Sequence, residues 1–105
     1  MIAQPGVTLY SQNKINYMLY NNQGNNTIID GFSIDGRNDG LGNAHSQAND
    51  KCIWSNKDNM TINNMKVFNT YQGGGVYLEG GASYTTLNNI KTFNHGYFGI
   101  AILGN

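Results

Sequence analysis

The sequence predicts an all-β solenoid, a right-handed parallel β-helix of about four turns with three short strands in each turn. Three observations predict it. A nine-residue segment recurs at a spacing of 25 residues. The chain holds 18 Asn and 14 Gly, which form turns readily and helices poorly. The apolar residues lie in short runs with the period of two that is typical of strands.

The repeat extends over most of the chain. Residues 61–69 read TINNMKVFN and residues 86–94 read TLNNIKTFN, so six of the nine letters are identical. GVYLEG at 75–80 is followed 24 positions later by GIAILG, and NNTIIDGFSIDG at 25–36 fits the template of 61–69 with an offset of 33. YMLYNN, which starts at Tyr17, takes the place of VYLEGG. Repeats of this length indicate a solenoid.

Each repeat is expected to hold three strands, such as residues 76–78, 85–87 and 90–92. A single turn cannot bury its own inner face, whereas stacked turns can, at the roughly 4.8 Å spacing of hydrogen-bonded strands. Equivalent strands then run parallel, and the coil is expected to be right-handed. No segment has the apolar stripe of a helical repeat.

Two Asn residues are expected to form a ladder. Asn64 and Asn89 hold equivalent positions between the second and third strands, where the chain must turn within about two residues. Asn tolerates left-handed backbone geometry, and stacked amides hydrogen-bond from turn to turn. Gly31 takes this place in the preceding repeat. We therefore expect Asn64 to lie against Asn89 and Ile62 against Leu87.

Composition excludes several classes of function. Charged residues make up 11% of the chain and the formal net charge is zero, which argues against nucleic acid and against an electrostatic membrane surface as partners. No apolar run is long enough for a transmembrane helix, and the first residues lack the pattern of a signal peptide. Cys52 is the single cysteine, so it forms no intrachain disulfide and is expected to be a small buried hydrophobe.

Three segments carry a family resemblance. PGVTL at 5–9, NNTIIDGFSIDG at 25–36 and GVYLEGGASYTTLNN at 75–89 resemble the right-handed parallel β-helix proteins of the pectate-lyase-like superfamily. The resemblance covers almost the whole chain. It implies a polysaccharide partner and an extracellular, cell-surface or virion-surface location. The reaction stays open, because lyases, hydrolases, epimerases and non-catalytic fibres share the pattern.

Residues 1–105 are expected to form one β-helix segment with uncapped ends. This leads us to expect a slice of a longer solenoid, or a chain whose ends are covered by partner chains through end-to-end self-association or in a trimer of the parent. The long insertion at 37–50 links a third strand to the next first strand. Insertions in solenoids gather on one face, often the binding face, and in the resembling enzymes this face is the sugar-binding groove.

The insertion holds the candidate catalytic residues. Arg37 is expected to pair with a uronate carboxylate and His45 to move protons. Asp39 and Asp50 are expected to act as acid and base or to hold Ca²⁺, the candidate metal. Any activity is expected of the parent protein more than of this segment alone. The competing interpretation is that these four are ordinary solvated loop residues.

Outward positions on the neighbouring first strands supply the candidate substrate-binding residues, which are Lys51, Ser55, Tyr77 and Glu79. Ser55 joins this set if Cys52 and Trp54 point inward. Most of the tyrosines are available to stack on sugars or to cover the edge of the solenoid. His95 lies in a short turn, and turn formation is its simpler role.

Two other functions compete with carbohydrate processing. The chain would also suit a non-catalytic binding or structural solenoid, such as a segment of a tailspike, an adhesin or a surface fibre. It would equally suit a self-assembling filament in which open ends pair between chains.

Overall fold

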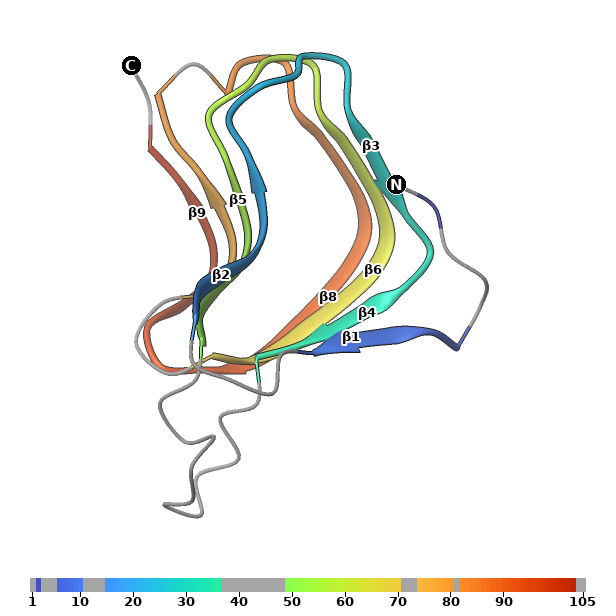
Figure 1. The fold of residues 1–105 in the computed structure, drawn as a ribbon, viewed down its shortest axis with the longest axis vertical. Helices are drawn as coiled ribbons and strands as arrows, with labels where there is room; N and C mark the ends of the chain where they lie inside the picture. Colours follow the sequence, from blue (N-terminus) through green and yellow to red (C-terminus); the bar gives the residue numbers. More distant parts are fainter. Residues whose placement is uncertain are drawn as a thin grey trace.

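The computed structural model describes residues 2, 6–10, 15–36, 49–70, 74–80 and 82–103, and every regular element within them is a β-strand (Figure 1). The fold is therefore all-β, as predicted. The strands in this part of the chain are β1 (Thr8–Tyr10), β2 (Ile15–Asn21), β3 (Ile28–Asp30), β4 (Ser33–Asp35), β5 (Asn49–Ser55), β6 (Thr61–Thr70), β7 (Gly74–Leu78), β8 (Thr86–His95) and β9 (Phe98–Ile102).

The strands form two parallel sheets, and from β4 onward the chain passes from one to the other with each strand. One sheet has the order β2-β5-β7-β9, and the other has the order β1-β4-β6-β3 with β8 paired to β6. Figure 1 shows the two sheets curving and facing each other across the interior. Ile62 pairs with Leu87, which confirms the predicted stacking of residues 25 positions apart.

The bends of the second sheet lie where the sequence places them. Asn64 and Asn89 have φ angles of 53° and 57°, and Gly31 has a φ of 89°, so all three adopt the left-handed geometry expected of them. The expected separation into second and third strands holds on either side of Gly31, between β3 and β4. In β6 and β8 the two halves continue as one ten-residue strand, because pairing resumes directly after each Asn.

Two ladders of side-chain amides run across these strands, and each begins at an aspartate. Asn89 Nδ2 donates to Asn64 Oδ1 over 2.9 Å, and Asn64 Nδ2 donates to Asp30 Oδ1 over 3.1 Å. The second ladder joins Asn94, Asn69 and Asp35 in the same way. The predicted pair of Asn64 and Asn89 is confirmed, and each ladder has a carboxylate as its first member.

The core lies between the two sheets and consists of columns of similar residues. Ile29 pairs with Ile62, and Ile34 pairs with Val67, so like apolar side chains lie on top of one another. The core side chains are Ile29, Phe32, Ile34, Cys52, Ile53, Met60, Ile62, Met65, Val67, Val76 and Leu78. Burial of these side chains removes apolar surface from water and is the main favourable contribution to the stability of the fold.

The predicted register of the first repeat on the other sheet is wrong by two residues. YMLYNN was expected to place Tyr17 over Val76, whereas Leu19 pairs with Ile53 and Ile53 with Val76. Tyr20 accordingly pairs with Trp54. The observed register puts an aliphatic side chain in the core column and leaves the tyrosines outside it.

Candidate functional site

A row of aromatic side chains crosses the outer face of the sheet β2-β5-β7-β9. Its central members hold equivalent positions, since Tyr20 pairs with Trp54 and Trp54 with Tyr77. Neighbouring strands are roughly 4.8 Å apart, so side chains at equivalent positions contact one another. We call this set the aromatic row, and its members are Tyr17, Tyr20, Trp54, Tyr77, Tyr97 and Phe98.

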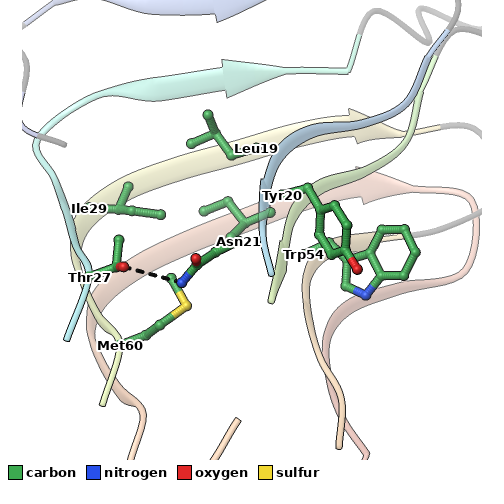
Figure 2. Close-up of a pocket in the computed structure, with 8 residues that line it drawn as sticks. Leu19, Tyr20, Asn21, Thr27, Ile29, Trp54 and Met60 are labelled. Atoms are coloured by element: carbon green, nitrogen blue, oxygen red, sulfur yellow. Dashed lines mark hydrogen bonds between the residues drawn. The ribbon is translucent and has the colours of Figure 1, made fainter. Parts of the chain in front are cut away.

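The rings are packed continuously along the row. The Tyr20 and Trp54 rings are stacked, with centroids 4.3 Å apart and planes 27° apart. Tyr77 lies edge-on to Trp54 at 6.1 Å and is followed by Phe98 at 5.7 Å. Figure 2 shows the Tyr20 and Trp54 rings side by side on the far side of the strands from Leu19. The rings therefore form a continuous aromatic surface across the strands of this sheet.

A cation and a carboxylate flank the central indole. Lys51 Nζ lies 5.0 Å from the centroid of the Trp54 ring and 5.1 Å from that of Tyr77, which is the geometry of a cation–π contact. Trp54 Nε1 donates a hydrogen bond of 2.7 Å to Glu79 Oε1. Three of the four predicted binding residues, Lys51, Tyr77 and Glu79, therefore gather around Trp54.

The fourth predicted binding residue, Ser55, is wrong as an outward position. Ser55 is fully buried, and its Oγ accepts a hydrogen bond from the backbone N–H of Lys57. The expected shared orientation of Cys52 and Trp54 is also wrong, because Cys52 and Ile53 are consecutive and both buried. Two inward residues in succession interrupt the alternation of the strand, so Trp54 joins Lys51 on the outer face.

The candidate catalytic residues lie almost wholly outside the described residues. Arg37, Asp39 and His45 fall in the undescribed part of the insertion, and Asp50 is described only as a backbone position in β5, next to Lys51. The structure therefore leaves their expected roles untested. Within the described ranges, no group of three or more His, Cys, Asp or Glu side chains is arranged to hold a metal ion.

A pocket of about 220 Å³ lies at the connection between β2 and β3 (Figure 2). Its lining includes the core residues Ile29, Ile53 and Met60. Asn21 also lines the pocket, and its side-chain amide already has hydrogen-bond partners. Asn21 Nδ2 donates to Gly24 O over 2.8 Å and to Thr27 Oγ1 over 3.2 Å. The pocket offers few polar groups to a sugar, and the aromatic row is the better candidate for a binding face.

A buried dyad connects the ends of β6 and β8. Thr70 Oγ1 lies 2.8 Å from His95 Nδ1, and burial lowers the pKa of the His95 ring. His95 Nε2 is buried without a hydrogen-bond partner in the described part of the chain. Because Thr70 is completely buried, no substrate reaches its hydroxyl group, and the dyad is a structural element.

Sequence reasoning missed Trp54 as the centre of the face. The signal that could have found it is the recurrence of an aromatic residue at one strand position in successive repeats, namely Tyr20, Trp54 and Tyr77. The irregular spacing of the repeats obscured this column, because the long insertion separates its first two members.

Comparisons with protein-family models, with curated proteins and with solved structures found no match to this chain. The described residues contain no helix long and apolar enough to cross a membrane.

Proposed function

We propose that the chain is a segment of a right-handed parallel β-helix of the pectate-lyase-like kind, with about four turns, in which the second and third strands of a turn are separate at Gly31 and continuous in β6 and β8. The proposal is supported by the two parallel sheets, by the regular pairing of residues 25 positions apart and by the left-handed Asn residues at the bends. An extracellular, cell-surface or virion-surface location belongs to the same proposal, because it follows from the resemblance.

The function proposed is binding of an acidic polysaccharide along the outer face of the sheet β2-β5-β7-β9. The observation that carries the proposal is the aromatic row with Lys51 and Glu79 at its centre. The side-by-side aromatic rings offer apolar contacts to sugar rings, hydroxyl and carboxylate groups bind sugar hydroxyls, and an ammonium group attracts a uronate carboxylate. This surface runs across the strands, so a linear polymer would contact several of them.

The single tryptophan makes binding directly observable, because Trp54 lies within the proposed face. Titration with a uronic-acid oligosaccharide is expected to change the intrinsic fluorescence in a saturable way. Calorimetry with the Trp54→Ala variant is expected to show at least tenfold weaker binding, because a central aromatic contact is lost. Circular dichroism checks that the Trp54→Ala variant is folded. Trp54→Phe is the control, because it keeps an aromatic ring at this position.

The acidic character of the ligand has its own test. Lys51→Gln is expected to weaken binding of the uronic-acid oligosaccharide about fivefold, since an exposed charge pair contributes up to about 1 kcal/mol. The same variant should bind the methyl-esterified oligosaccharide as the unaltered protein does. Tyr84→Asn serves as the matched control, because Tyr84 is 84% exposed and lies outside the aromatic row. Unchanged affinity in both Trp54→Ala and Lys51→Gln would contradict the proposal that the aromatic row binds a polysaccharide. The stacked rings would then only stabilise the sheet.

Processing of the bound polymer is a separate part of the proposal and rests on Arg37, Asp39, His45 and Asp50. Release of unsaturated or reducing ends from a uronate polymer, and its loss in His45→Ala, is the expected result. A calcium ion held by Asp39 and Asp50 would make binding or release sensitive to chelation, and repeating both assays with EDTA tests it.

The second candidate is a non-catalytic solenoid that associates with itself. One observation favours it: among the strands that the structure describes, β9 is the last of its sheet, and Ile102 is 69% exposed and the adjoining Leu103 48% exposed. Edge strands with apolar side chains pair readily with further strands. Sedimentation velocity over a range of concentrations is expected to show growing species if this candidate is correct, whereas a constant sedimentation coefficient would exclude it.

A further inference from the structure

A second surface, with mostly polar lining, lies on the other sheet and therefore on different strands from the aromatic row. It is a groove of about 280 Å³ that runs across the bends of β4, β6 and β8. We call it the corner groove, and it is lined by Gly6, Gly31, Phe32, Ser33, Asn64, Met65, Lys66, Asn89 and Lys91. Most of its exposed lining consists of polar groups, in contrast to the pocket beside β2.

Two lysines occupy directly opposite positions in this groove. Ser33 pairs with Lys66, and Lys66 pairs with Lys91, so the two lysine side chains start from adjacent strands, which lie roughly 4.8 Å apart. Both side chains are exposed. Lys66 Nζ lies 5.7 Å from the centroid of the Phe68 ring, and neither lysine has a carboxylate partner among the described residues. Like charges directly opposite each other on a sheet are destabilising, and a bound anion would remove that cost.

The amide ladder supplies further donors beside the lysines. Asn89 uses one N–H of its side chain for Asn64 Oδ1, and Asn64 uses one for Asp30 Oδ1. A primary amide has two N–H groups, so each residue keeps a second donor beyond its ladder bond. Ser33 also lines the groove. The groove therefore combines two cations with neutral donors, and its acidic neighbour Asp30 is engaged by Asn64.

We propose that the corner groove binds the carboxylate groups of an acidic polysaccharide, as a second site separate from the aromatic row. The lysines repeat at the strand spacing, which is close to the length of one sugar unit, so successive carboxylates of a polymer lying across the strands would meet successive lysines. Nucleic acid fits less well, because two lysines and a chain of zero net charge lack the basic surface that phosphate backbones require. The choice of polysaccharide rests on the proposed function, whereas the anion site rests on the groove.

The experiment uses a uronic-acid tetrasaccharide and follows the side-chain amide resonances of Asn64 and Asn89 by NMR. A saturable shift of these resonances is expected, and the double variant Lys66→Gln, Lys91→Gln is expected to weaken this binding about tenfold. The control is Lys57→Gln, which removes the same charge from the connection between β5 and β6, outside the groove, and should leave the affinity unchanged. The double variant relieves repulsion between like charges, so it is expected to fold.

The two sites can fail separately. Shifts of Asn64 and Asn89 without a change in Trp54 fluorescence would support the corner groove and reject the aromatic row. A change in Trp54 fluorescence without shifts of the two amides would reject the groove alone. Equal binding of the methyl-esterified tetrasaccharide, or unaltered binding by the double variant, would also overturn the groove proposal. Tighter binding of a DNA or RNA oligomer at these resonances would overturn the assignment to a polysaccharide.

Discussion

Asn89 donates its side-chain amide to Asn64, 25 positions earlier in the chain, over a distance of 2.9 Å. Both ladders have this polarity, since each amide donates toward the preceding strand and the first member of each is an aspartate. A carboxylate accepts hydrogen bonds and donates none, so no further bond is donated beyond Asp30 in one ladder or Asp35 in the other. The ladders thus link the bends of successive strands, and the aspartate is the member of each ladder that comes first in the sequence.

Substitutions at Asn64 separate the ladder bonds from the backbone geometry. Asn64→Gly removes one donated and one accepted bond and keeps the left-handed φ, so we expect a loss of about 1–2 kcal/mol in the free energy of unfolding. Asn64→Ala removes the same bonds and adds roughly 1 kcal/mol or more for the left-handed conformation. Urea denaturation measures both. Equal stability of the Gly and Ala variants would contradict the backbone part of this explanation.

Tyr84 is a bulky residue in a left-handed conformation. Its φ of 56° matches those of Asn26 and Asn59, which hold the equivalent position in the preceding repeats. Because Tyr84 is 84% exposed, its ring contributes little packing. Tyr84→Asn is therefore expected to raise the free energy of unfolding by about 0.5–1 kcal/mol, through relief of steric cost. A lower melting temperature in this variant would show that the tyrosine ring makes a stabilising contact.

The dyad of Thr70 and His95 predicts a dependence of stability on pH. Burial lowers the pKa of His95 below its ordinary value of 6.5, so the unfolded chain binds the proton more readily than the folded protein. The neutral His95 ring contributes fully to the stability of the folded protein above about pH 6.5. This contribution is lost as the pH falls through 6.5 toward the lowered pKa of His95. Unfolding of the unaltered protein and of His95→Gln at pH 8 and pH 5 is the measurement. The unaltered protein is expected to lose more stability on acidification, and parallel losses would contradict the assignment to His95.

Cys52 is expected to be chemically inert in the folded protein. It is completely buried, its Sγ lies 3.8 Å from the carbonyl oxygens of Ile34 and Phe68, and burial raises the pKa of its thiol to about 12. Since the thiolate is the reactive form, an aromatic disulfide reagent at pH 8 should modify it slowly. Addition of urea above the unfolding midpoint should restore rapid reaction of one thiol per chain. Rapid reaction without denaturant would contradict the buried position.

Gly75 marks a close approach of the two sheets. A Cβ atom at Gly75 would lie 2.6 Å from Val67 Cγ2 and 2.8 Å from the Gly99 carbonyl oxygen, so Gly75→Ala is expected to cost about 1–3 kcal/mol through overpacking. Gly24→Ala is the matched control, because the nearest atom to its Cβ would be Thr27 Oγ1 at 3.6 Å. That variant is expected to change stability by less than about 0.5 kcal/mol. Thermal unfolding compares the two, and similar melting temperatures would contradict the close approach.

The surroundings of Trp54 in the aromatic row could be predicted from the sequence only in part. The sequence placed Lys51, Tyr77 and Glu79 on one outer surface, and the structure brings them together around Trp54. It placed Ser55 there as well, although Ser55 is buried. The difference arises at Cys52 and Ile53, where two consecutive inward residues interrupt the alternation. Strict alternation along a strand is the assumption behind a sequence-based choice of face, so one such interruption reverses every residue beyond it.

The sequence by itself determined the all-β class, the parallel stacking and the positions of the Asn bends. It could do so because each repeat contacts mainly its neighbours, and like residues at a constant offset then meet by simple translation. Only the tertiary structure decided that Trp54 faces outward, that Asp30 and Asp35 begin the ladders and that Lys66 and Lys91 share a groove. These features depend on how side chains from both sheets fill one interior and on the curvature of the strands at their bends, and neither is encoded in the repeat pattern of a single strand.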